Sequence, residues 1–340
     1  MTHNLWRRIF VSMATVLAVL GVAATATAAD YEWKWQSYWQ PGTVNQKAFE
    51  QFAANVKEKS NGRIDIEILP VNAVVPPSEM LEAVGANILQ GMNGGTGYFV
   101  GKDAAFAMIC DFNAGYESPG QLSQWFYEGG GIAMAQELYA LHGVKYLGPV
   151  IYGAESIPSK MPLRNIRDFK GIKMRSPEGM GAAIWRTLGV GVSTLPGTEV
   201  YTALERGKIE ATDWGTLGMN DELGYDAIAP YAIYPGIHSI PAADVSMNMK
   251  LWNSLPSDIK QVIQEAVGSF NEDSIEKNLR LDDAYVAKRD PDTLISWGTK
   301  ERRELREVAQ GIWAKWAKKS EMAQRVYDSH IAHMKNVGLL

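Results

Sequence analysis

Along the first part of the chain, apolar residues with the spacing of a β-strand alternate with apolar residues at helical spacing. Residues 31–39 (YEWKWQSYW) and 63–69 (RIDIEIL) predict β-strands, the second with Ile64, Ile66 and Ile68 on one buried face. Between them, residues 43–62 place apolar side chains at helical spacing and end at Asn-Gly, which predicts an amphipathic helix. A strand, a helix and a second strand in this order predict a βαβ unit, the start of a parallel sheet with helices on its faces.

Strand and helix patterns continue to alternate through the middle of the chain. They predict strands at residues 144–155, 171–176 and 190–196, and helices at residues 178–189 and 197–207. A short apolar run at residues 209–212 then predicts a strand that ends at Asp213-Trp214. Because open α/β sheets bind ligands outside the carboxyl ends of their strands, Asp213 is a candidate binding residue.

The last third of the chain predicts helices. Residues 257–290 and 300–336 form two long amphipathic runs, and the second carries Ile312, Trp313 and Trp316 at helical spacing. These three side chains indicate packing within the chain, with a contact between subunits as the alternative. His330 and His333 follow on the same run, where we expect a solvated face.

The N-terminus has the pattern of a secretory signal. Arg7 and Arg8 precede an apolar run from residue 9 to about residue 22, and the small residues AATATAAD follow. Cleavage is predicted near Ala28 or Ala29, and the apolar run is shorter than the ~20 residues that a membrane span needs. Export to the periplasm follows, by either the general or the twin-arginine route.

Charge and cysteine content exclude several functions. Without residues 1–29 the chain keeps 31 lysines and arginines against 38 acids, a net charge of −7, with no basic tract. This composition argues against binding to nucleic acid or to an anionic membrane. Cys110 is the only cysteine, so it has no partner for an internal disulfide, and its apolar flanks predict a small buried residue.

Motifs of common enzymes are absent from the sequence. It contains no H-E-x-x-H, G-x-S-x-G or P-loop motif, and the glycines of residues 94–101 miss the dinucleotide-binding spacing. Of the five histidines, only His238, in YPGIHSIP, lies near a suggestive motif. Glu155 and Asp213 could form the carboxylate pair of a secreted hydrolase, which is the alternative to a binding protein.

Several stretches together carry a resemblance to a known family. Residues 174–214 (MRSPEGMGAAIWRTLGVGVSTLPGTEVYTALERGKIEATDW), together with GYFVGKDAAFAM and DELGYDAIAPYAIYPG, resemble the solute-binding proteins of tripartite ATP-independent periplasmic (TRAP) transporters. Within that family they are most similar to the branch that binds 2-oxo and 2-hydroxy carboxylates. The likeness runs from about Tyr31 to the end of the chain.

The resemblance implies a fold and a function. The fold is α/β, with two hinge-connected lobes of mixed sheets flanked by helices; we expect a signal peptide at 1–29, lobe 1 at 30–150, lobe 2 at 151–250, and helices of residues 251–340 packing across both lobes. The function is that of a receptor, not an enzyme. It captures a small organic acid by domain closure and delivers it to the TRAP membrane permease. The C-terminal helices could also form a homodimer.

The resemblance also implies the site residues. Arg175 is expected to bind the ligand carboxylate, which matches the planar fork of a guanidinium, and Tyr98 is expected to reach the ligand with its hydroxyl. Asp213 and Trp214 are expected to hold a metal ion through a carboxylate oxygen and a backbone oxygen, and the Trp214 side chain is also expected to line the apolar side of the ligand pocket. Oxygen ligands of this kind suit Ca²⁺ or Na⁺.

At two positions the sequence departs from that branch. Glu155 stands where the branch has a glutamine that contacts ligand and metal, and Ser239 stands where it has a second metal-binding glutamate. One hypothesis is that Glu155 keeps the charge that the metal needs, with Ser239 as a further ligand. The other is that the metal site is lost and Glu155 accepts a hydrogen bond from a hydroxyl or amine of the ligand.

Overall fold

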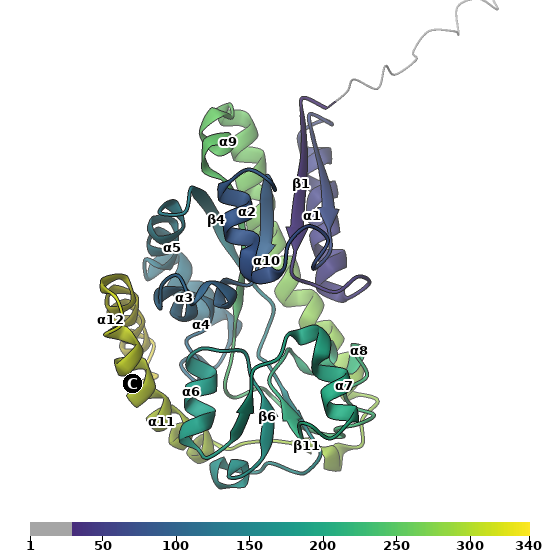
Figure 1. The fold of residues 1–340 in the computed structure, drawn as a ribbon, viewed down its shortest axis with the longest axis vertical. Helices are drawn as coiled ribbons and strands as arrows, with labels where there is room; N and C mark the ends of the chain where they lie inside the picture. The colour runs from purple at the N-terminus through teal and green to yellow at the C-terminus, as the bar shows by residue number, and fades with distance from the viewer. Residues whose placement is uncertain (1–28) are drawn as a thin grey trace, which may run out of the picture.

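The computed structural model describes residues 29–340, so the predicted signal segment lies outside the described residues except for its last position. The chain forms two lobes, each built on a sheet, with long helices running between them (Figure 1). No helix in the described part of the chain combines the length and the apolar character needed to cross a membrane.

The first lobe contains a five-stranded mixed sheet. Its strands are β2 (Ile64–Leu69), β1 (Tyr31–Ser37), β3 (Gly91–Gly94), β10 (Ala242–Asn248) and β4 (Val144–Ile151), in this spatial order. β1 pairs in parallel with β2 and β3, whereas β10 runs antiparallel between β3 and β4. The predicted βαβ unit at the start of the chain is therefore confirmed, with α1 (Val44–Lys59) as its helix.

Short helices cover this first sheet. They are α2 (Met80–Gly85), α3 (Ala105–Cys110), α4 (Pro119–Glu128), α5 (Gly131–Ala140) and α9 (Met249–Ser254), with the 3₁₀ turns η1 (Pro77–Glu79) and η2 (Thr96–Phe99). α1 begins after Thr43, whose side chain accepts a hydrogen bond from the backbone N–H of Gln46. Threonine is a preferred residue at this N-cap position. Cys110, at the end of α3, is half-buried rather than fully buried, and burial raises the pKa of its thiol.

The second lobe contains a six-stranded mixed sheet. Its strands are β11 (Leu294–Ile295), β9 (Tyr231–Ile233), β5 (Ile157–Ser159), β8 (Ala211–Thr212), β6 (Lys173–Arg175) and β7 (Gly191–Ser193), in this spatial order. The helices α6 (Met180–Thr187), α7 (Val200–Glu205) and α8 (Leu217–Glu222) flank it, together with η3 (Ile166–Phe169), η4 (Gly197–Glu199) and η5 (Pro291–Thr293). β6 pairs in parallel with both β7 and β8, so the carboxyl ends of these three strands share one edge.

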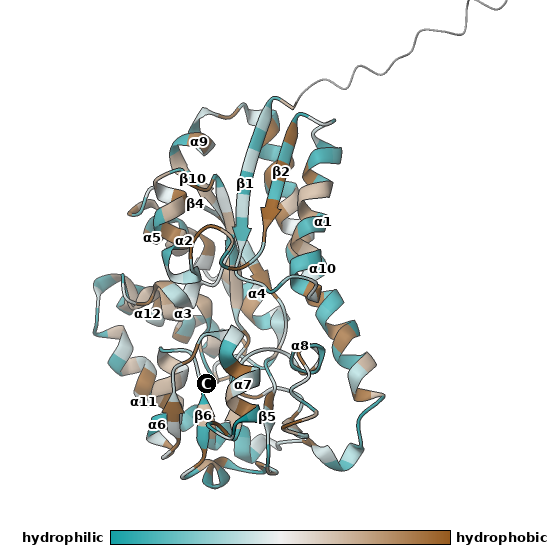
Figure 2. Cartoon of the chain, turned by 45° about the vertical axis from the view of Figure 1, so that its right-hand side comes forward, coloured by the Kyte–Doolittle hydropathy of each residue, from teal (hydrophilic) through white to brown (hydrophobic). Residues whose placement is uncertain are grey.

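Three long helices connect the lobes. α10 (Ser257–Val286) contacts α1 and β4 of the first lobe and α8 of the second, while α11 (Thr299–Ala317) packs on α6 and α12 (Glu321–Asn336) packs on α3 and α5. Figure 2 shows apolar and polar residues interspersed along these helices, and apolar side chains of all three are buried. Ile312, Trp313 and Trp316 are buried, which confirms their packing within the chain.

The chain crosses between lobes more often than the predicted ranges allow. β10 falls within residues 151–250, predicted as lobe 2, yet it pairs with β3 and β4 of the first sheet, and β11 of the C-terminal region pairs with β9 of the second. The reason is that a polypeptide strand joins the sheet that offers it hydrogen-bonding edges, whatever its place in the sequence. Residues 152–156 and 234–241 are therefore both crossings between the lobes.

The expectation of a solvated face for His330 and His333 is wrong. His330 is fully buried, with its ring 4.2 Å from that of Phe112 and 3.7 Å from that of Trp125. Its Nδ1 lies 2.7 Å from the Tyr116 hydroxyl, and burial lowers the pKa of the imidazole well below its usual range. His333 is also buried. Both histidines lie on the face of α12 that packs on α3 and α4, so they belong to the core.

Asp244 is a buried acid in the first sheet, and its effect on the stability of the protein should depend on pH. It is buried on β10, where the Ser246 hydroxyl donates to its Oδ2 at 2.6 Å, and burial raises its pKa to about 7. Because the folded state favours the neutral acid, this contribution to stability is present below the unfolded pKa of ~4 and is lost as the pH rises through about 7. We expect Asp244→Asn to exceed the wild type in unfolding free energy by roughly 1–4 kcal/mol at pH 8 and to match it near pH 4.

Urea unfolding of both proteins at pH 4 and pH 8 measures this difference. Asp65→Asn is the control, because Asp65 is half-exposed and pairs with Lys57 at the surface. An advantage of Asp244→Asn that is equal at both pH values would contradict a buried acid as its cause.

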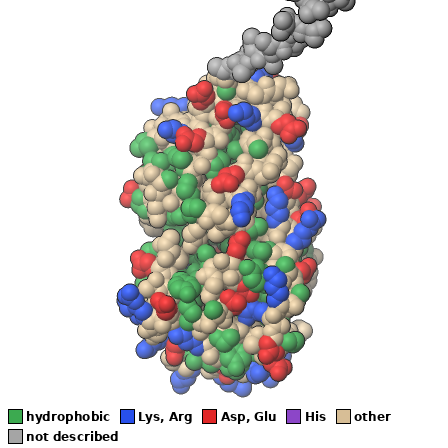
Figure 3. Space-filling model, turned by 90° about the vertical axis from the view of Figure 1, so that its right-hand side faces the viewer, with side chains coloured by type: hydrophobic (Ala, Val, Ile, Leu, Met, Phe, Trp, Pro, Cys, Tyr) green, Lys and Arg blue, Asp and Glu red, His purple; other side chains and the backbone are tan. Residues whose placement is uncertain are grey.

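Acidic and basic side chains are interspersed over the face of the molecule in Figure 3. On this face neither sign of charge forms a continuous field. This distribution agrees with the mixed composition of the chain and offers no track for a polyanion on the side shown.

Candidate functional site

Arg175 and Asp213 lie side by side at the edge where parallel strands of the second sheet end. Arg175 is the last residue of β6, Asp213 follows β8 directly, and the Asp213 backbone N–H donates to the Arg175 carbonyl at 3.0 Å. Parallel pairing of β6 with β8 brings these two strand ends together. The strand-end position inferred from the sequence is therefore the position that the fold produces.

The Arg175 guanidinium is held in a fixed plane. The side chain is buried, its Nε donates to the Leu195 carbonyl at 3.0 Å, and its Nη1 donates to the Asp213 carbonyl. The Trp214 ring centre lies 5.3 Å from its central carbon, a cation–π contact. These two hydrogen bonds occupy Nε and Nη1. They fix the orientation of the third nitrogen, Nη2, which takes part in neither bond.

The Asp213 carboxylate has one oxygen anchored and one directed at a histidine. Ser176 Oγ donates to its Oδ2 at 3.0 Å and the Trp185 indole N–H donates to the same oxygen at 3.4 Å. Its Oδ1 lies 3.3 Å from His238 Nε2. Burial alone would raise the pKa of Asp213, but the His238 imidazole and the Arg175 guanidinium hold it well below its usual range.

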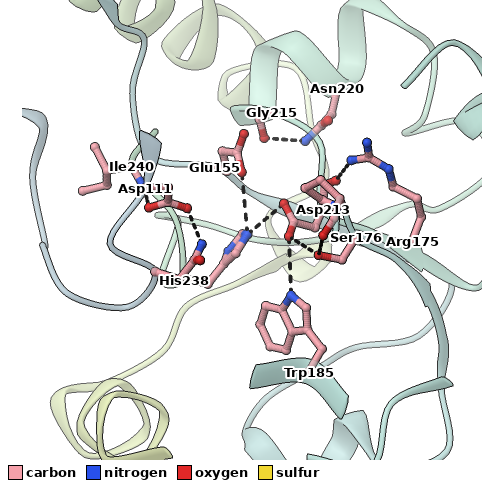
Figure 4. A network of polar contacts seen from close by, with 12 residues as sticks. Asp111, Glu155, Arg175, Ser176, Trp185, Asp213, Gly215, Asn220, His238 and Ile240 are labelled. Atoms are coloured by element: carbon pink, nitrogen blue, oxygen red, sulfur yellow. Dashed lines mark hydrogen bonds and ion pairs between the residues drawn. The ribbon is translucent and has the colours of Figure 1, made fainter. Parts of the chain in front are cut away.

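Glu155 has a similar arrangement and faces the same nitrogen of the histidine. The Tyr152 hydroxyl donates to its Oε1 at 3.2 Å, and its Oε2 lies 3.9 Å from His238 Nε2 (Figure 4). Burial, together with the neighbouring carboxylates of Asp213 and Asp111, raises the pKa of Glu155 well above its usual range. The Glu155 backbone N–H donates to the Ser239 carbonyl at 2.9 Å, which ties the two crossings between the lobes together.

Sequence reasoning did not select Asp111 and did not assign His238 a role. Asp111 is a half-buried acid from the first lobe; the Ile240 backbone N–H donates to its Oδ1 at 3.3 Å, and desolvation raises its pKa to about 7. The Ser239 hydroxyl acts against burial at both acids and lowers the pKa of Asp111 and of Glu155. His238 is buried on the second crossing, beside the Trp185 ring. Its position in YPGIHSIP next to Ser239 was the only signal available in the sequence.

Tyr98 reaches the site from the first lobe. It lies on η2, half-buried, and burial raises the pKa of its phenol while the Arg175 guanidinium acts in the opposite direction. Trp214 is half-buried, and within residues 29–340 its buried indole nitrogen has no hydrogen-bond partner. The residues singled out from the sequence therefore share one region, between the lobes and around their crossings.

The donor atoms of this region could hold a cation, and they include an imidazole nitrogen as well as oxygens. Glu155, Asp213 and His238 each offer one donor atom within 4.8 Å of the other two, and all three residues are buried. The predicted set of Asp213, Trp214 and Ser239 contains only oxygen donors. The imidazole nitrogen changes the chemistry of the set, because carboxylates suit hard ions and imidazole suits transition metals.

Comparison with known proteins places the chain in a family. The sequence profile of the bacterial extracellular solute-binding proteins, family 7, matches residues 36–320, and the chain belongs to this family of TRAP transporter receptors. A monocarboxylate 2-oxoacid-binding periplasmic protein from Nostoc is 30% identical over 316 residues, which cover 90% of this chain and 84% of that protein. The family is periplasmic, and its members typically deliver their ligand to a membrane permease.

Solved structures of TRAP solute-binding proteins share the fold. One from Rhodobacter sphaeroides, in an open state without ligand, is 35% identical, covers 91% of this chain and 99% of its own, and has a TM-score of 0.77. One from Pseudoalteromonas atlantica holds sodium and pyruvate (25% identity, 90% and 94% covered, TM-score 0.80). One from Colwellia psychrerythraea holds calcium and pyruvate (25% identity, 90% and 95% covered, TM-score 0.75). Each of these two relatives therefore holds a metal ion together with pyruvate.

Proposed function

We propose that this receptor captures a small 2-oxo or 2-hydroxy monocarboxylate and delivers it to a TRAP permease. The observation that carries the proposal is the buried Arg175, fixed through Nε and Nη1 at the carboxyl end of β6, with Nη2 left to meet a carboxylate. The relatives from Pseudoalteromonas and Colwellia hold pyruvate, a 2-oxo monocarboxylate. A charge-assisted hydrogen bond from a preoriented guanidinium provides both affinity and orientation.

The surrounding residues supply the remaining contacts in this proposal. The Tyr98 hydroxyl, from the first lobe, reaches the same carboxylate, so the ligand bridges the lobes and selects the closed state. The Trp214 indole N–H is a donor for a ligand oxygen. Asp213 and Glu155 hold a cation, with the Trp214 carbonyl and Ser239 as further predicted ligands. A bound cation would offset the charge of the buried acids and would supply a positive partner for the 2-oxo or 2-hydroxy oxygen of the ligand.

Export and the lack of catalysis belong to the same proposal. Residues 1–29 are proposed as a signal peptide that directs the protein to the periplasm. Binding without turnover is proposed in preference to a hydrolase that uses Glu155 and Asp213. Turnover of any ligand by purified protein, lost in Asp213→Asn, would overturn this choice.

A panel of organic acids tests the proposed ligand class. Pyruvate, lactate, branched-chain 2-oxo acids and, as a negative control, a C4-dicarboxylate are compared by thermal shift and calorimetry. We expect 2-oxo or 2-hydroxy monocarboxylates to stabilise the protein, by about 2.7 kcal/mol at 100 times the dissociation constant. Stabilisation by the dicarboxylate alone would contradict the proposed class.

A homodimer through the C-terminal helices remains a proposal with a restricted geometry. Ile312, Trp313 and Trp316 are buried within the chain, so a dimer would have to use other faces of α11 and α12. Light scattering on the mature protein measures the mass. A monomer at micromolar concentration would end this proposal without affecting the others.

Gly197 tests whether Trp214 forms part of the pocket. Gly197 begins η4 directly against the Trp214 ring, and a Cβ at this position would overlap the ring atoms. We expect Gly197→Ala to displace the indole from Arg175, to weaken ligand binding about tenfold and to destabilise the protein by about 1–3 kcal/mol. Calorimetry and thermal unfolding measure the two effects.

The matched control for this substitution is Gly268→Ala. Gly268 lies in α10, where a Cβ would meet nothing within 4 Å, so alanine should be neutral or stabilise by up to ~1 kcal/mol. Unchanged ligand affinity in Gly197→Ala would show that the Trp214 ring is not needed for binding.

A further inference from the structure

The two buried acids of the site are arranged around one imidazole nitrogen. Asp213 has its Oδ2 bonded by Ser176 and Trp185, and Glu155 has its Oε1 bonded by Tyr152. The other oxygen of each carboxylate, Oδ1 and Oε2, lies 3.3 Å and 3.9 Å from His238 Nε2. Figure 4 shows the three side chains converging on one point from separate segments of the chain.

The histidine nitrogen is not satisfied by these neighbours. Among the described residues neither ring nitrogen of His238 has a hydrogen-bond partner of acceptable geometry. Water cannot readily take that place, because only 3% of the side chain is exposed. A buried polar atom without a partner is costly and calls for an explanation. The imidazole nitrogen faces two carboxylate oxygens at ion-pair distance but outside hydrogen-bond geometry, an arrangement that a bound metal ion would satisfy.

We propose that Glu155, Asp213 and His238 bind a divalent transition-metal ion of the Zn²⁺ class. This inference names the ion for the cation site within the proposed function. One nitrogen and two carboxylate oxygens form a three-ligand protein set that leaves a position for an exogenous ligand, as in open zinc sites. A hard ion such as Ca²⁺ takes six to eight oxygens, whereas imidazole favours zinc and its neighbours in the periodic table.

Charge balance supports a divalent ion. Glu155 and Asp213 contribute two negative charges when they bind a metal, a monocarboxylate adds a third, and Arg175 offsets one of them. The Asp111 carboxyl is half-buried and is not counted in this balance. A divalent ion beside a neutral imidazole brings this buried cluster to zero, whereas Na⁺ would leave it negative by one charge. Buried charges must be compensated, so the divalent ion is favoured.

The surrounding hydrogen bonds support the same assignment. Metal-binding carboxylates are oriented by outer donors that occupy their second oxygen. Ser176 and Trp185 do this for Asp213, and Tyr152 does it for Glu155. Glu155 and His238 also lie on the two crossings between the lobes, so a bound ion would link both crossings to the strand end at Asp213.

Cobalt binding tests the site without any organic acid. Untagged mature protein, stripped with a chelator, is titrated with Co²⁺ while its visible absorption is recorded, and Zn²⁺, Ca²⁺ and Na⁺ are then added as competitors. We expect one Co²⁺ per chain with ligand-field bands in the visible range, displaced by Zn²⁺ but not by millimolar Ca²⁺ or Na⁺. His238→Gln should weaken Co²⁺ binding roughly 100-fold or more, because it removes the nitrogen ligand.

His142→Gln is the matched control, since it removes a half-buried imidazole from the end of α5 in the first lobe. It should bind Co²⁺ as the wild type does. Wild-type protein that shows no Co²⁺ bands, or bands that persist in His238→Gln, overturns the proposal. Displacement of Co²⁺ by millimolar Ca²⁺ also overturns it, since an oxygen-only site would then be present.

These outcomes are separate from the proposed function. Organic-acid binding by chelated protein that is lost in His238→Gln would show that the imidazole itself takes the place of the cation, and would overturn the metal while leaving the receptor. Metal binding without any response to organic acids would support the metal site and would contradict the proposed ligand class.

Discussion

Arg175→Lys is expected to weaken binding of the organic acid by about 30-fold to a few thousandfold, equivalent to about 2–5 kcal/mol. Lysine keeps the positive charge but cannot hold the Leu195 and Asp213 carbonyls while presenting an oriented N–H to a ligand carboxylate. Isothermal titration with the tightest acid from the panel measures the loss.

The control for this substitution is Arg186→Lys. Arg186, on α6, is half-exposed and pairs with Glu178 at the surface, so the same change should leave ligand affinity unaltered. Circular dichroism confirms that both variants are folded before titration. An Arg175→Lys protein that binds within threefold of the wild type would remove Arg175 from the ligand site.

Arg289→Ala is expected to destabilise the protein by about 3–5 kcal/mol, which corresponds to a fall of roughly 5–8 °C in Tm. Arg289 follows α10 and donates from its Nε to Asp221 Oδ2 of α8 at 2.8 Å, and from its Nη1 to the Pro230 carbonyl at 2.6 Å. The Asp221 side chain is fully buried and that of Arg289 is 7% exposed. Removal of the guanidinium leaves a buried carboxylate without compensation.

Arg280→Ala separates this effect from the general loss of an arginine. Arg280 pairs with Glu276 on the exposed face of α10, and its removal should cost no more than about 0.5 kcal/mol. Replacing both partners, with Arg289→Met and Asp221→Leu together, should recover most of the stability, because no buried charge is then left alone. Equal Tm values for Arg289→Ala and Arg280→Ala would show that the buried pair does not stabilise the second lobe.

Part of the site could be predicted from local sequence because strand ends are local features. The run at residues 209–212 predicts a strand, and Asp213 follows it, so its place at the binding edge required only the rule for open α/β sheets. The pairing that sets Arg175 beside it is a parallel one between β6 and β8, and both strands carry recognisable patterns. The resemblance to TRAP receptors then gave Tyr98, Trp214 and Ser239 their expected roles, which stay predictions.

The histidine and the third acid could not be predicted in the same way. Asp111 receives the Ile240 N–H across 129 positions of the chain, and His238 meets Asp213, at the end of β8, from the second crossing between the lobes. No local period records such meetings, since they depend on β10 leaving the second lobe to pair between β3 and β4. The wrong expectation for His330 has the same origin: helical spacing shows a face, but not the helices α3 and α4 that cover it.

By itself the sequence determined the alternation of strands and helices, the βαβ start of the first sheet and the position of Asp213 at a strand end. These depend on periodicity, caps and turns within a few residues, which neighbouring atoms decide. Only the tertiary structure decided that two crossings between the lobes bring Glu155 and His238 to Asp213. Burial then removes water from the charged groups, so each must be compensated by another, and that compensation is what makes the cluster a site.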